Sequence, residues 1–192
     1  MKSVLAAVFG ILSFVLFADT LDLRSGDSVC KIDGEHGARI MSWKVCGEEM
    51  LWMPPVPQKD DGKWRHGGIP IVWPWQGDEY PDGITNGPLH GIAWQSPFKV
   101  ERRTKTEHGE SLSLSLEADG LRADYTVSVR RESLRFSFRT TNIGSAPRKF
   151  AMSIHPYFYL PERKENMKYS VQMQYFWCFI SGMKVREVSS EN

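Results

Sequence analysis

The chain has 192 residues, of which 41% are hydrophobic and 12% aromatic, a composition sufficient for one globular domain with a hydrophobic core. Its 24 Lys and Arg residues nearly balance its 23 Asp and Glu residues, so it lacks the charge excess typical of nucleic-acid or anionic-membrane binding. No CxxC, HExxH or EF-hand pattern is present, so no metal site is predicted. We expect Cys30, Cys46 and Cys178 to be small core residues, the alternative being a Cys30–Cys46 disulfide.

Residues 1–18 have the pattern of a secretory signal peptide. Lys2 forms a positive n-region, and Val4 to Ala18 is an uncharged apolar stretch. This stretch is shorter than the ~20 residues that a membrane-spanning helix needs. We therefore predict export, periplasmic or secreted, with cleavage after Ala18 and a mature domain over residues 19–192. An uncleaved membrane anchor is the alternative.

The rest of the chain has a β-strand pattern, with no repeat and no helix longer than the signal segment. Apolar and polar residues alternate in several runs, which predicts strands with one buried face. Turn signals fall at Asp119-Gly120 and over Asn142 to Pro147. The expected strand runs are Val29–Ile32, Ala38–Val45, Glu48–Met53, and the faces Leu112/Leu114/Leu116, Tyr125/Val127/Val129 and Leu134/Phe136/Phe138, with Arg135, Ser137 and Arg139 pointing outward.

Two regions depart from this regular pattern. Eight of the eleven prolines lie between positions 54 and 97, which predicts loops and short strands there. The run 151–160 reads as a strand, and Pro156 within it indicates an edge or a bulge. After a polar stretch, residues 169–180 are apolar and aromatic. A last strand with a frayed tail explains them, or a C-terminus that is truncated or frame-altered. Together these features predict an all-β, antiparallel sandwich that is incomplete at its C-terminus.

The most distinctive segment is residues 66–77, HGGIPIVWPWQG, followed by PLHGIAW over residues 88–94. Its glycines and prolines exclude regular helix. Its tryptophans offer flat apolar faces of the kind that stack on sugar rings, although an aromatic mini-core under a long loop is as good an explanation. The nearby acids show no pair placed as glycoside hydrolysis requires, and we expect them to be solvated: Asp60, Asp61, Asp78, Glu79 and Asp82.

Two of the five histidines are candidates for acid–base chemistry near neutral pH. His90 lies in the aromatic loop, and His155 lies beside Tyr157 in a strand-like run. His36 and His108 sit in glycine-containing turns, and we assign both to solvent.

These motifs together resemble the aldose 1-epimerase (mutarotase) superfamily, in particular its hexose-6-phosphate 1-epimerases. The resemblance covers roughly residues 20–160. Residues 37–43 and 49–52 are similar to the family's opening strands, GAxxxSW and LW. Residues 66–77 and 88–93 match GGIPxxWPxxG and PxHGxA, and residues 154–158 are similar to its HxYF motif.

The resemblance implies a large antiparallel β-sandwich that interconverts the α and β anomers of a hexose or hexose 6-phosphate. A base removes the anomeric hydroxyl proton while an acid protonates the ring oxygen, and no cofactor is needed. By the family pattern His155 would be the acid, and His90 would hold the ring or anomeric oxygen. The substrate-binding residues would come from the aromatic loop: Arg65, His66, Trp73, Trp75 and Trp94.

The sequence departs from the family at three points. His66 stands where the family has the arginine of RGGIP, and Trp94 replaces the arginine of HGxAR. Since those arginines contact the sugar or its phosphate, we expect a preference for unphosphorylated aldoses or glycan ends, unless Arg65 turns inward. The family's catalytic glutamate has no counterpart in a matching motif among Glu162, Glu165, Glu187 and Glu191.

Three hypotheses follow: an active epimerase, a non-catalytic carbohydrate-binding module, or an inactive fragment of a longer enzyme. The expected partner is a small-molecule sugar, an aldose or a sugar phosphate, and neither nucleic acid nor, after signal cleavage, a membrane is expected. The missing glutamate separates the first hypothesis from the other two.

Overall fold

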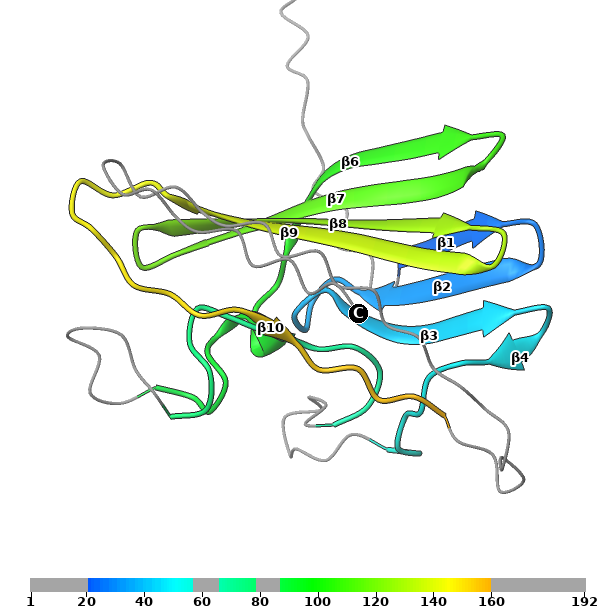
Figure 1. Cartoon of the computed structure of the whole chain (residues 1–192), viewed down its shortest axis with the longest axis horizontal. Helices are drawn as coiled ribbons and strands as arrows, with labels where there is room; N and C mark the ends of the chain where they lie inside the picture. The colour runs from blue at the N-terminus through cyan, green and yellow to red at the C-terminus, as the bar shows by residue number, and fades with distance from the viewer. Residues whose placement is uncertain (1–20, 57–65, 79–86, 160–192) are drawn as a thin grey trace, which may run out of the picture.

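The computed structural model describes residues 21–56, 66–78 and 87–159, and it shows two stacked antiparallel sheets (Figure 1). Both sheets run in chain order from one edge to the other, as expected for consecutive hairpins. One sheet contains β1 (Leu21–Ser25), β2 (Ser28–Asp33), β3 (Arg39–Val45) and β4 (Glu48–Glu49), and the other contains β6 (Lys99–Thr106), β7 (Gly109–Ala118), β8 (Leu121–Arg130) and β9 (Ser133–Asn142).

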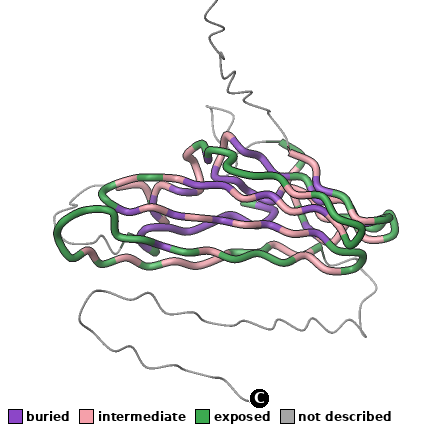
Figure 2. The backbone as a smooth tube through the Cα atoms, turned by 90° about the horizontal axis from the view of Figure 1, so that it is seen from above, coloured by how far each residue is buried: buried purple, intermediate pink, exposed green. Residues whose placement is uncertain are grey.

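Burial alternates along β7 and β8, the two central strands of the β6–β9 sheet. Every second residue of β8 is buried, and the register places Leu114, Tyr125 and Phe138 side by side on the inner face. Asp119 and Gly120 both have positive φ, at 51° and 73°, which fits the tight turn predicted between β7 and β8. Figure 2 shows the result as buried positions in mid-strand and exposed hairpin ends. The predicted strand faces are therefore confirmed for β7 and β8.

The core lies between the sheets. The β1–β4 sheet contributes buried side chains from its first three strands, and β7 and β8 supply the facing layer. Burial of this apolar area is the main force that holds the sandwich together, at ~25 cal/mol per Å². The largest fully buried hydrophobic side chains that the strands of these two sheets contribute are Leu23, Ile32, Ile40, Leu112, Leu114, Leu121, Tyr125 and Val127.

A third region, which we call the loop layer, comprises residues 66–78, 87–98 and 150–159. It contains β5 (Ile71–Val72), β10 (Ser153–Ile154) and a 3-10 turn, η1 (Ala93–Gln95). Its centre is the extended run 68–74, which is paired along both edges. Residues 69 and 73 pair with Ile40 and Gly91, whereas 70–72 and 74 face residues 151–155.

This pairing explains how the proline-rich sequence is still held in place. Pro70 and Pro74 lack amides, but their carbonyls accept hydrogen bonds from the His155 and Ala151 amides at 3.2 and 2.8 Å. Gly91 has a φ of 77°, and a β-carbon there would lie 2.1 Å from the Trp73 carbonyl oxygen. Glycine at this position therefore lets two loops approach to hydrogen-bonding distance.

Several sequence predictions need correction. The predicted strand over residues 151–160 forms a ladder only at β10, with an isolated bridge from Phe158 to Leu51. Phe136 was expected on an inward face, but 39% of it is exposed, because β9 is the last strand of its sheet among the described residues. β1 and β6 had no strand prediction, since β1 is short and β6 carries charged residues on nearly every exposed position.

The cysteines follow the expectation in part. Cys30 is buried as a small core residue, whereas Cys46 is exposed in the β3–β4 turn, and both are free thiols. Cys178, the signal segment 1–18 and the aromatic tail lie outside the described residues, so export and the C-terminal hypotheses stay predictions. Within the described part of the chain, no helix is long and apolar enough to cross a membrane.

Candidate functional site

Four aromatic rings gather where the loop layer meets the end of the β1–β4 sheet, and we call them the ring cluster: Trp52, His66, His155 and Tyr157. Tyr157 is its centre. Its ring centroid lies 4.8 Å from that of His155, 6.0 Å from that of His66 and 6.1 Å from that of Trp52. Trp52, His66 and His155 are exposed, whereas Tyr157 is half-buried. The cluster is therefore a solvent-facing surface of apolar rings and imidazoles.

Backbone pairing places these side chains. The His155 amide bonds to the Pro70 carbonyl, and the Tyr157 amide bonds to the Gly68 carbonyl at 2.8 Å. The Trp52 amide donates to the Tyr157 carbonyl, and the Trp52 carbonyl accepts the Gly68 amide. Three chain segments thus meet at Gly68. Because the segment is extended, His155 and Tyr157 project on the same side of it.

A buried arginine lies beneath the cluster. Arg39 begins β3, is 1% exposed, and donates from Nη1 to the Gly67 carbonyl at 2.9 Å. Burial lowers the pKa of Arg39 to about 10, so the guanidinium remains charged at neutral pH. Burial raises the pKa of the Tyr157 phenol, and the positive charge of Arg39 opposes that rise.

His90 occupies a separate position in the loop layer. It has a positive φ of 67°, an uncommon conformation for a residue with a β-carbon. Its amide bonds to the Gly77 carbonyl, and its Nδ1 accepts the Gly77 amide at 3.0 Å. An imidazole whose Nδ1 is an acceptor carries its proton on Nε2 when neutral. His90 can therefore donate a hydrogen bond from Nε2 to a ligand oxygen.

The two candidate histidines lie on opposite edges of the run 68–74. His155 is level with Pro70, and Gly91, next to His90, is level with Trp73. Their backbones are therefore separated by ~10 Å along the segment and ~10 Å across it. The segments that carry both histidines pair with the same extended run, and the hydrogen bonds of the described residues include none between the two imidazoles.

The tryptophans named from the sequence serve the loop layer. Trp73 is fully buried and donates from Nε1 to the Thr140 hydroxyl at 3.0 Å, and Trp75 is 3% exposed and donates to the Pro88 carbonyl. Neither ring presents a face to solvent, which favours the mini-core explanation for both. Trp94 is half-buried, with Nε1 bonded to the Leu89 carbonyl, and keeps part of its ring accessible.

The remaining predicted residues divide as follows. His66 joins the ring cluster, whereas Arg65 lies outside the described residues. His36, assigned to solvent, is half-buried, and its Nδ1 contacts the Asp33 carboxylate at 2.9 Å, because the turn folds it back onto β2. His108 is exposed, as expected. Among the described residues, no group of three metal-ligating side chains is present.

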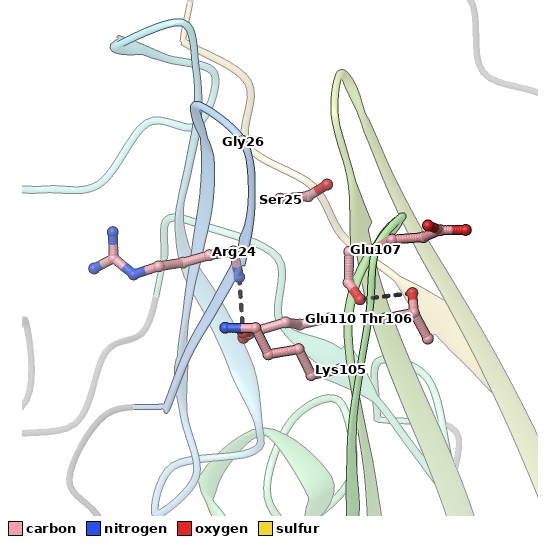
Figure 3. Close-up of a pocket in the computed structure, with 8 residues that line it drawn as sticks. Arg24, Ser25, Gly26, Lys105, Thr106, Glu107 and Glu110 are labelled. Carbon is pink, nitrogen blue, oxygen red and sulfur yellow. Dashed lines mark hydrogen bonds and ion pairs between the residues drawn. The ribbon is translucent and has the colours of Figure 1, made fainter.

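A hollow elsewhere in the fold lies between the β1–β2 and β6–β7 turns (Figure 3). Its most buried charged group, Glu110, already has basic partners, since Arg103 lies 2.8 Å and Lys105 3.2 Å from its carboxylate. The Arg24 amide also bonds to this carboxylate, while the Arg24 guanidinium points away from it. These contacts lower the Glu110 pKa and give the hollow a structural role.

Sequence reasoning missed three residues of this site. Trp52 and Arg39 were noted only as parts of opening-strand motifs, and Tyr157 only as a neighbour of His155 and as part of the HxYF motif. No residue over 151–159 is buried and Pro156 interrupts the run, so no alternating pattern marked Tyr157 as a centre. Only the pairing of Gly68 with both 52 and 157 reveals the cluster.

Comparison with known proteins identifies the family. The aldose 1-epimerase family model matches residues 21–191, so the chain belongs to that family. The chain is 33% identical over 84 residues to a protein of Salmonella typhimurium provisionally named glucose-6-phosphate 1-epimerase. The aligned segment covers 43% of this chain and 28% of that protein. An Escherichia coli protein with the same name is 33% identical over 82 residues, covering 42% and 27%. The chain thus spans less than a third of these curated relatives.

Solved structures agree on the fold. A crystal structure of a Synechocystis sp. PCC 6803 protein superposes with a TM-score of 0.66 at 22% identity, covering 74% of this chain and 55% of that one. A galactose mutarotase-like protein from Clostridium acetobutylicum gives a TM-score of 0.61 at 13% identity, covering 76% and 52%. The described sandwich is therefore of the galactose mutarotase-like type.

Proposed function

We propose that this chain binds the ring of an aldose at the ring cluster and exchanges its anomers, with His155 as the acid. The observation that carries the proposal is the exposed His155 imidazole, held 4.8 Å from the Tyr157 ring on a strand that is hydrogen-bonded at Pro70 and Gly68. Apolar ring faces suit the C–H patches of a sugar, and a fixed imidazole suits proton transfer near neutral pH. Family membership supports the same reaction.

The proposed reaction needs two proton transfers. A base takes the proton of the anomeric hydroxyl while protonated His155 gives its proton to the ring oxygen, and the bond between C1 and that oxygen breaks. Rotation about the C1–C2 bond of the open-chain aldehyde and the reverse transfers close the other anomer. His90 fits a supporting role, because its Nε2–H is free to hold a sugar oxygen.

The base of this reaction is not found among the described residues. Among the described residues, no carboxylate forms an ion pair with His155 or His90. The glutamates that follow His155 lie outside the described residues. One acid–base partner contributes a factor of ~10²–10⁴ to the rate. We therefore expect anomer exchange by this chain to be slower, by about that factor, than exchange by a complete acid–base pair.

Exchange NMR on the anomeric protons of glucose tests the function directly. Protein-dependent exchange should fall by ~10²-fold or more in His155→Ala, because the acid is lost. His108→Ala is the matched control, since His108 is an exposed histidine in the β6–β7 turn. An unchanged rate in His155→Ala rejects the acid role. Glucose binding without exchange in the unmodified chain favours the non-catalytic binding module, and the absence of both rejects the proposal.

We also propose a preference for unphosphorylated aldoses. None of the four side chains of the ring cluster carries a permanent positive charge, and Arg39 is buried beneath them. A phosphate dianion is normally gripped by exposed arginine. Calorimetric titration should therefore give tighter binding of glucose than of glucose 6-phosphate. Tighter binding of the phosphate that is lost in Arg65→Ala would reverse the assignment.

A further inference from the structure

We propose that Arg39 is the positioning residue of the ring cluster: its buried guanidinium fixes the Gly67–Gly68 turn, and through that turn it sets the relative placement of His66, Trp52 and Tyr157. The inference that this placement serves a sugar rests on the proposed function. The placement itself rests on contacts of described residues alone.

The first step is the anchor. Arg39 Nη1 donates to the Gly67 carbonyl at 2.9 Å across a sequence separation of 28 residues. The arginine is 1% exposed, and placing a charged group in such a position costs free energy unless it is hydrogen-bonded. A charged donor in a buried site also bonds more strongly than a neutral one. The Gly67 carbonyl is therefore held firmly against the start of β3.

The second step is the turn itself. Gly67 and Gly68 both have positive φ, at 95° and 62°. A β-carbon on Gly67 would lie 2.7 Å from Met53 Sδ, and one on Gly68 would lie 2.2 Å from the Ile40 carbonyl oxygen. The turn thus passes so close to β3 and to Met53 that only glycine fits. Its position depends on β3, the strand that carries Arg39.

The third step links the turn to the rings. His66 directly precedes Gly67, and its ring meets that of Tyr157 edge-on at 6.0 Å. Gly68 bonds through its amide to the Trp52 carbonyl and through its carbonyl to the Tyr157 amide, both at 2.8 Å. A shift of the turn consequently moves three of the four members of the ring cluster. His155 follows because its ring lies against that of Tyr157.

Two substitutions separate the hydrogen bond from the charge. Arg39→Met keeps a long apolar stem but removes both, whereas Arg39→Lys keeps the charge and loses the planar fork. Val127→Ala, a buried substitution in β8, controls for general loss of stability, and the exposed Arg135→Met controls for loss of a positive charge. All four variants are made in the full chain.

The first measurement is the set of NMR contacts between the rings of the cluster. Arg39→Met should weaken the His66–Tyr157 contacts, because the Gly67 carbonyl loses the donor that holds the turn. Arg39→Lys should weaken these contacts less, and Val127→Ala and Arg135→Met should leave them unchanged. Unchanged His66–Tyr157 contacts in Arg39→Met overturn the proposal.

The second measurement is glucose affinity. Arg39→Met should weaken binding about tenfold, equivalent to ~1.4 kcal/mol, and Arg39→Lys should recover part of that loss. If the parent chain binds no glucose, the proposed function fails, yet the NMR contacts between His66 and Tyr157 still decide the positioning role. If Arg39→Met does not fold, Arg39→Lys carries the test: faster exchange of the Gly68 amide than in the parent supports the anchor, and an equal rate overturns it.

Discussion

The β6–β9 sheet and the loop layer reach order in different ways. In β7 and β8, apolar residues recur at every second position over most of each strand, so many similar contacts share the packing. The loop layer has few ladder pairs and depends on individual contacts, such as the Gly77 amide on His90 and the Trp73 indole on Thr140. We therefore expect the regular sheet to tolerate single substitutions, because many similar contacts stabilise it, whereas the loop layer depends on a few contacts.

The two regions also place their polar groups differently. In the sheet, charges such as Arg122 point outward, where they bond to Glu117 and Asp124. In the loop layer, polar groups point inward toward backbone carbonyls, as the Trp75 indole does toward Pro88. Exposed pairs of the first kind contribute little to stability, whereas an unpaired buried group of the second kind is costly. Each of the following predictions tests this difference.

The largest effect is expected for Gly91→Ala in the loop layer. The added β-carbon would sit 2.1 Å from the Trp73 carbonyl oxygen in a left-handed conformation, so both overpacking and backbone strain oppose it. We expect a loss of ~2–5 kcal/mol in the free energy of unfolding. Denaturant titration measures it.

Gly47→Ala is the matched control, since Gly47 also has positive φ, 84°, but meets no atom within 4 Å. Strain alone should cost ~1–2 kcal/mol there. Equal losses at the two positions would mean that the loop layer is no more sensitive to a single residue than a hairpin turn.

A smaller effect of opposite sign is expected for Tyr125→Phe in the sheet. Among the described residues, the buried Tyr125 hydroxyl has no hydrogen-bond partner, and burial raises its pKa strongly. Removing an unsatisfied buried hydroxyl should stabilise the fold by up to ~1–2 kcal/mol. Thermal unfolding of the variant checks the sign. A clear loss of stability would show that the hydroxyl has a partner such as a bound water, and that the sheet also depends on single polar contacts.

The smallest effect is pH-dependent and concerns Glu110→Gln. Arg103 and Lys105 hold the pKa of the Glu110 carboxyl below its usual value, so the ionised group stabilises the fold above the unfolded-state pKa. That contribution is lost as the pH falls through the lower, folded-state pKa. The parent should therefore lose its advantage over Glu110→Gln on acidification, as measured by unfolding between neutral pH and pH ~3. A constant difference across this range would contradict the ion-pair explanation.

The accuracy of the strand prediction from sequence differed between regions of the fold. Alternation located the buried faces of β7 and β8, although Leu116 is only partly buried and Ser115 on the other face of β7 is buried, and the Asp119-Gly120 pair marked their turn. It failed for β6, whose residues are almost all exposed, because an edge strand need not bury an apolar face. It failed for Phe136 for a related reason: an inward direction in the pattern does not guarantee a covering layer in space.

The amino-acid sequence by itself determined the all-β class, the family and the candidacy of His155 and His90, because strand periodicity and motif order are local properties of the chain. Only the tertiary structure decided which aromatic rings face solvent. It buried Trp73 and Trp75, exposed Trp52, and placed Arg39 under Gly67. Burial and long-range hydrogen bonds depend on which segments meet, and that is settled by the packing of the whole domain rather than by any run of residues.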